Sequence, residues 1–89
     1  MSRVVFTGPH AALAAALGAG AYAGCAPEGA VGEAIEELDL PPALRLERPA
    51  VGDEIVDTAA WNLPEPVGLC LEEVRELCSV IEERVSRLR

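Results

Sequence analysis

The sequence predicts a small α+β domain, in the order β-α-α-β-β-α, with a long C-terminal amphipathic helix packed on a small sheet. Two observations carry this prediction. Apolar residues from Val67 onward recur at spacings of four and three, the period of an α-helix. Residues 44–48 instead alternate between apolar and charged side chains, the period of a half-buried strand. The length of 89 residues suits one such domain, spanning residues 1–89.

The N-terminal part predicts a strand, a turn and a helix. Residues 3–7 read Arg-Val-Val-Phe-Thr, and β-branched and aromatic residues favour strands. Gly8-Pro9 then marks a turn, and the alanine-rich stretch His10–Leu17 predicts a helix. Three glycines between Gly18 and Gly24 have two interpretations: the helix stops near Gly18, or they let another backbone approach closely.

The central part predicts one helix and two strands. Apolar residues at helical spacing place a helix over Ala30–Leu38, and the prolines that follow end it. Its adjacent Glu36 and Glu37 do not converge on one point, so we expect a solvated face rather than a metal site. The alternating residues 44–48 and the run Glu54–Thr58 predict two strands that pair as a hairpin.

The single tryptophan, Trp61, lies in a proline-rich segment that suits neither a helix nor a central strand. We expect its ring to fold onto the small core. The alternative is an anchor at a binding surface, where tryptophan is enriched.

The C-terminal helix, predicted over Val67–Arg89, has an apolar face that needs a partner, because an isolated helix of this length is marginal in water. The spacing of the apolar residues is that of a coiled-coil seam. We therefore predict a self-association interface on this helix, with docking inside the chain alone as the alternative. The predicted interface residues are Leu71, Val74, Cys78, Ile81, Val85 and Leu88.

The charge of the chain limits its partners. The formal net charge is −8, and the seven basic residues are all arginines scattered along the sequence. Nucleic-acid binding needs a concentrated positive surface, so we expect no nucleic-acid partner. A positively charged partner, or solubility alone, explains the acidity better.

The cysteines, Cys25, Cys70 and Cys78, are odd in number and show no Cys-x-x-Cys spacing. We expect reduced, mostly buried thiols in a cytoplasmic protein. In an alternative interpretation, the apolar run before Ala23-Gly24-Cys25 resembles a bacterial lipoprotein signal, with Cys25 acylated. Gly8-Pro9-His10 interrupts that run, so we expect no membrane association unless the chain is lipidated.

The turn at Gly8–His10 resembles the opening of a phosphate-binding unit, since a helix N-terminus attracts anions. It lacks the Gly-Lys-Ser/Thr ending of a P-loop, so we expect an ordinary strand–helix turn with His10 near solvent. His10 with Cys25 or Cys70 has the composition of a nucleophile–base pair, but nothing in the sequence shows that they meet. No zinc, serine-nucleophile or dinucleotide motif is present, and we expect no cofactor or metal.

We therefore expect a non-enzymatic structural or interaction protein: an oligomerising module or a small subunit of a larger assembly, with a protein or a second copy as partner. The grounds are a small core, an amphipathic terminal helix and no assembled chemistry. The alternative is a small-molecule-binding or catalytic α+β protein that uses the Gly8–His10 turn. A bacterial lipoprotein acylated at Cys25 is the third possibility.

Overall fold

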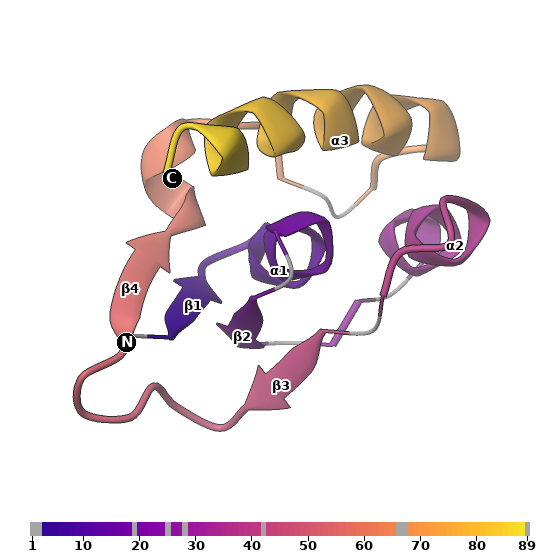
Figure 1. Cartoon of the computed structure of the whole chain (residues 1–89). Coiled ribbons are helices and arrows are strands. Elements are labelled where there is room, and N and C mark those ends of the chain that lie inside the picture. Colours follow the sequence, from indigo (N-terminus) through magenta and orange to yellow (C-terminus); the bar gives the residue numbers. More distant parts are fainter. Residues whose placement is uncertain are drawn as a thin grey trace.

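The computed structural model describes residues 3–18, 20–24, 26–27, 29–41, 43–65 and 68–88. The prediction of a small α+β domain with a C-terminal helix packed over a small sheet is confirmed, with one strand, β2, more than expected. Figure 1 shows the elements in chain order: β1 (Val4–Thr7), α1 (Ala11–Gly18), β2 (Ala21–Ala23), α2 (Gly29–Glu37), β3 (Leu44–Leu46), β4 (Glu54–Asp57), the 3₁₀ helix η1 (Thr58–Trp61) and α3 (Leu71–Ser86).

The four strands form one parallel sheet in the order β3-β2-β1-β4. The predicted hairpin of residues 44–48 with residues 54–58 is therefore wrong, because β3 and β4 lie at opposite edges of the sheet. An alternating pattern shows that the two faces of a strand differ, but it does not identify the strand that pairs with it.

A seven-residue connection, 47–53, joins the two edge strands and lies on the side of the sheet away from the helices (Figure 1). The connection must cross three strand spacings of about 4.8 Å, or roughly 14 Å, and return along the strands by about 10 Å. From residue 46 to residue 54 there are eight residue steps of about 3.3 Å, and their reach of roughly 26 Å exceeds the distance to be spanned. The chain reverses its direction across the sheet here, so a right-handed crossover places the connection on this side.

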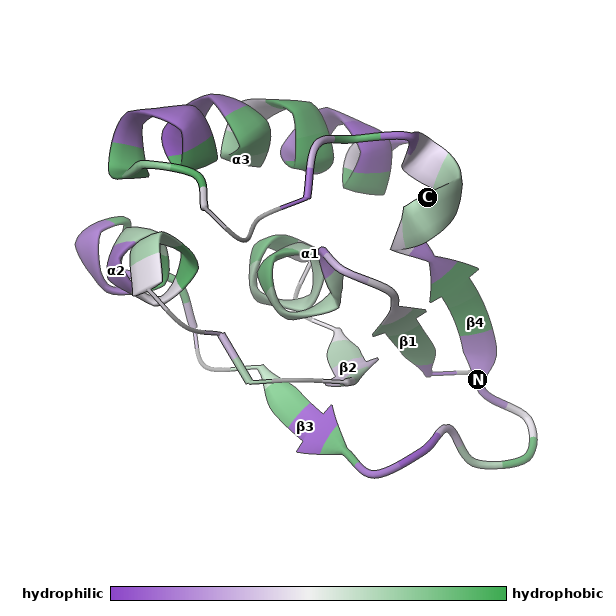
Figure 2. Ribbon diagram, turned by 180° about the vertical axis from the view of Figure 1, so that it is seen from behind, coloured by the Kyte–Doolittle hydropathy of each residue, from purple (hydrophilic) through white to green (hydrophobic). Residues whose placement is uncertain are grey.

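Helix α1 lies between the sheet and α3, and all three helices lie on one side of the sheet (Figures 1 and 2). Residues Ala11 to Ala16 are all buried, as suits a helix that is apolar on every side. The helix ends at Gly18, where a Cβ would lie 2.7 Å from Cγ1 of Val85. The interpretation that the helix stops near Gly18 is confirmed. The atoms close to Gly18 belong to the side chains of Val85 and Phe6, so the alternative, close approach of another backbone, does not hold at this glycine.

The two faces of the sheet carry different side chains. Phe6 and Tyr22 point to the helices and join the main core. Trp61 packs against that core, its ring edge-on to Phe6 with centroids 6.4 Å apart, which confirms the expected packing of the tryptophan. Val5 and Ala21 neighbour Phe6 and Tyr22 along their strands, so they point to the opposite face.

Candidate functional site

The β1–α1 turn, residues 8–10, lies at the carboxyl end of β1 beside β4, where the order of strands reverses. Open parallel sheets commonly bind ligands at such a point. Gly8 has φ of +90°, and a Cβ there would lie 2.7 Å from Thr58 Oγ1 and 2.9 Å from the backbone nitrogen of Ala59. The start of η1 therefore fills the position next to the turn.

Thr58 holds this turn through its hydroxyl group and is fully buried. The hydroxyl donates to the Thr7 carbonyl at 2.6 Å and accepts from the His10 N–H at 3.1 Å. The Ala11 N–H donates to the Gly8 carbonyl at 3.3 Å. A phosphate at the start of α1 would bind these amides, and both are already engaged.

His10 is 2% exposed, so the expectation of a histidine near solvent is wrong. Within the described part of the chain, neither ring nitrogen has a hydrogen-bond partner. Burial lowers the pKa of the ring below its usual value of about 6.5, and the backbone of Leu63 and Pro64 opposes this to a smaller extent. The imidazole is thus neutral at pH 7 and shielded from a substrate in solution.

Cys70 and Cys78, the two cysteines among the described residues, are both free thiols. Burial, and then the charge of Glu82, raise the pKa of the Cys78 thiol on α3. Cys70 is exposed at the N-cap of α3, so the expected burial holds for Cys78 and fails for Cys70. Cys25 lies outside the described residues, and so do the expectation that it is buried, the alternative of its acylation and its pairing with His10. Across the described ranges, no three potential metal ligands gather.

The residues predicted as an interface on α3 mostly form its inner side. Val74 and Ile81 are fully buried, as predicted, and Cys78 and Val85 are 4% and 7% exposed. Leu88, just beyond the helix, is 48% exposed. Docking of α3 on α1 and α2 accounts for the four buried residues.

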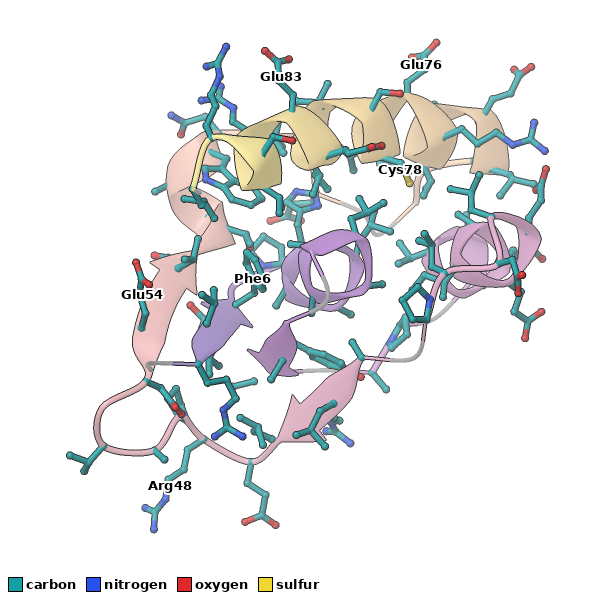
Figure 3. All side chains as sticks on the ribbon, in the orientation of Figure 1. Phe6, Arg48, Glu54, Glu76, Cys78 and Glu83 are labelled. Carbon is teal, nitrogen blue, oxygen red and sulfur yellow. The ribbon has the colours of Figure 1, made fainter. Side chains whose placement is uncertain are left out.

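The remaining features of α3 agree with this orientation. Leu71, its first residue, is half-buried, while Val67, where we predicted the helix to start, lies outside the described residues. Figure 3 shows Cys78 pointing toward the body of the domain and Glu76 and Glu83 pointing away from it. The acidic side of the helix is its solvent-facing side.

The sheet side turned away from the helices presents a surface that the sequence did not predict. We call it the outer face and define it by the row Leu44, Ala21, Val5 and Ile55, which lie opposite one another in register. Ala21 and Val5 are buried at its centre, whereas Leu44 is 57% and Ile55 49% exposed. We missed it because β2, the strand that aligns this row, was not predicted.

A depression of about 410 Å³ opens at the amino ends of the strands. Val4, Phe6, Val85 and Leu88 contribute apolar walls, and among the described residues Arg3 is the one charged residue that lines it. The Arg3 guanidinium already donates to the carboxylate of Asp53 at 3.0 Å. Small-molecule sites usually combine apolar walls with several convergent polar groups, and this depression has one arginine that is already paired.

Two further observations limit the possible roles. None of the helices in the described ranges has both the length and the apolar character needed to cross a bilayer. Comparison of the chain with protein-family models, curated proteins and solved structures finds no match. The fold itself defines a small α+β domain whose four-stranded parallel sheet has its helices on one side.

Proposed function

We propose that this chain is a non-enzymatic self-associating module and that two copies pair through the outer faces of their sheets. Parallel sheets are generally covered on both faces, because their strands bury apolar side chains on both sides. The helices cover one face here. On the other face Val5 and Ala21 are buried at the centre, while Leu44 and Ile55, on the two edge strands, remain about half exposed. A second copy would cover these two side chains.

Apolar exposure on this side extends beyond the strands. Val51, in the connection between β3 and β4, is fully exposed, and the connection lies on the same side of the sheet (Figure 1). Exposed apolar side chains that gather in one region indicate an interaction surface more strongly than scattered ones do. Leu44, Val51 and Ile55 together support a contact on this side.

The distribution of charge favours the same side. Helices α2 and α3 carry eight carboxylates and only two arginines, so two copies that met helix to helix would repel each other. Around the outer face the signs are mixed: Arg3 pairs with Asp53, and Arg48 lies beside Glu47 in the connection. In a twofold dimer, a surface patch of one copy faces the same patch of the other copy. A patch that carries charges of both signs can pair in this way without net repulsion.

The chemistry of the described residues supports a non-enzymatic role in the cytoplasm. His10 is buried and the amides of the β1–α1 turn are engaged, which leaves that turn without an accessible acid or base. Cys70 and Cys78 are free thiols, and such thiols persist in a reducing compartment.

The test places a charge on each side of the molecule. Ile55→Glu introduces a carboxylate on the outer face, and the matched control Val80→Glu introduces one on α3, where Val80 is 39% exposed. By sedimentation equilibrium at tens of micromolar, we expect wild type and Val80→Glu to be dimers and Ile55→Glu to be a monomer. An unpaired charge in an apolar contact costs several kcal/mol. Because about 1.4 kcal/mol corresponds to a tenfold change in affinity, Ile55→Glu should weaken dimerisation by at least about 100-fold.

Three outcomes would contradict the proposal: a monomeric wild type, a dimeric Ile55→Glu, or a Val80→Glu variant that alone becomes monomeric. If Val80→Glu alone became monomeric, the interface would lie on α3. Far-UV circular dichroism of each variant checks that its secondary structure is intact.

A further inference from the structure

Val51 is the most exposed large apolar side chain in the part of the chain that the structure describes. It lies in the turn 50–53, just before β4. We propose that the depression at the amino ends of the strands is the receptor for Val51 of a second copy, and that the second copy receives Val51 of the first in return. This inference rests on the proposed outer-face dimer and assigns that dimer one arrangement.

The turn that carries Val51 is held in place by hydrogen bonds. The Asp53 N–H donates to the Ala50 carbonyl at 3.2 Å, and the Asp53 carboxylate accepts the Ala50 N–H at 2.7 Å. Gly52 has φ of +93°, the positive value that the third residue of a type II turn requires. The Asp53 carboxylate also accepts from Arg3 at 3.0 Å, which ties the turn to the start of β1. Little conformational entropy is therefore lost when Val51 binds.

The depression suits an apolar protein side chain. Its volume is about 410 Å³, and Val4, Phe6 and Val85 are among its apolar walls. Leu44 also lines it and belongs to the outer face, so the depression and the outer face are continuous. Arg3, another lining residue, is bonded to the turn 50–53 of the same copy. The turn and the depression therefore lie side by side on one molecule, as a reciprocal contact between two copies requires.

Two sheets that meet face to face about a twofold axis have two simple arrangements. With the axis parallel to the strands, β3 of one copy lies over β4 of the other, and all amino ends lie at one end of the dimer. With the axis across the strands, each strand lies over its own counterpart, and the amino ends of the two copies lie at opposite ends. The turn 50–53 and the depression are both at the amino ends, so only the first arrangement brings them together.

The first arrangement also pairs the exposed side chains of the outer face. Leu44 is on β3 and Ile55 on β4, so Leu44 of each copy lies over Ile55 of the other. The turn 50–53 precedes β4, so Val51 of one copy lies over the start of the other copy's β3, where Leu44 lines the depression. The connection that contains the turn is on the side of the sheet that faces the second copy (Figure 1).

The first test shortens the Val51 side chain and measures dimer dissociation by sedimentation equilibrium. Val51→Ala removes apolar surface from two contacts in each dimer, so it should weaken dimerisation by at least about tenfold. The matched control Val80→Ala makes the same change on α3 and should leave the affinity of wild type unchanged. A Val51→Ala dimer as tight as wild type would overturn the depression contact alone. A monomeric wild type would contradict the outer-face dimer itself.

The second test locates the contact in wild type. In a mixed sample of isotope-labelled and unlabelled chains, we expect nuclear Overhauser effects between copies from Val51 to Val4 and from Leu44 to Ile55. Contacts of Ile55 with Ile55, or of Leu44 with Leu44, would show the axis across the strands. The outer-face dimer would then stand, and the depression would not be the receptor. Leu44–Ile55 contacts without Val51–Val4 contacts would also overturn the inference.

Discussion

Replacing Gly8 with alanine should destabilise the domain by about 3–4 kcal/mol. Its φ of +90° disfavours any side chain, which costs about 1–2 kcal/mol. The added Cβ would lie 2.7 Å from Thr58 Oγ1 and 2.9 Å from the Ala59 nitrogen, so the Thr58 hydroxyl must move. That movement breaks its bonds to Thr7 and His10, each worth about 1 kcal/mol.

A matched variant separates the two contributions. Gly52 has nearly the same φ, +93°, but a Cβ on it would have no atom within 4 Å. Gly52→Ala should therefore cost only the backbone strain, about 1–2 kcal/mol. Urea unfolding followed by circular dichroism measures both variants. Equal losses in Gly8→Ala and Gly52→Ala would refute the argument that Thr58 closes the β1–α1 turn.

Two further predictions concern α3. Ile81→Ala should cost about 2–5 kcal/mol in urea unfolding because Ile81 is fully buried, whereas Val80→Ala, one residue away and partly exposed, should cost less than about 0.5 kcal/mol. Similar losses in both would show that α3 does not dock by this side. In labelling with a thiol reagent, exposed Cys70 should react rapidly and buried Cys78 only on unfolding. Rapid labelling of Cys78 in the folded protein would contradict its burial.

Those elements that the sequence predicts well are the ones with a local signal. The stripe of α3 places Val74 and Ile81 in the core, and the apolar run before Gly8 gives β1. The capping of α3 is also local: the Glu73 carboxylate accepts the Cys70 N–H at 3.2 Å, one half of a capping box. Local patterns identify which residues are buried, but they do not identify what buries them.

The sheet topology was not predictable from these patterns. Strand β2 is the short run Ala-Tyr-Ala at 21–23, and alanine has a low strand propensity, so only its place between β1 and β3 makes it a strand. Without β2, the strand that lies between β3 and β1 was missing, and residues 54–58 were the predicted strand nearest in sequence to residues 44–48.

The candidate surface was missed for the same reason. The outer face exists only once β2 aligns Leu44, Val5 and Ile55 in one row. The expectation for His10 failed because its ring is buried, with the backbone of Leu63 and Pro64 beside it, and no sequence spacing shows where a loop packs. The role of Thr58 in closing the β1–α1 turn could not be predicted from the sequence, because Thr58 lies 48 residues from its partner His10.

Intermolecular nuclear Overhauser effects test the outer-face dimer most directly. A mixed sample of isotope-labelled and unlabelled chains shows only contacts between copies. We predict intermolecular contacts from the methyl groups of Leu44, Val51 and Ile55, the exposed apolar side chains on that side of the sheet. Contacts from Val80 or Leu88 instead, or no intermolecular contacts at concentrations near a millimolar, would contradict the proposed dimer.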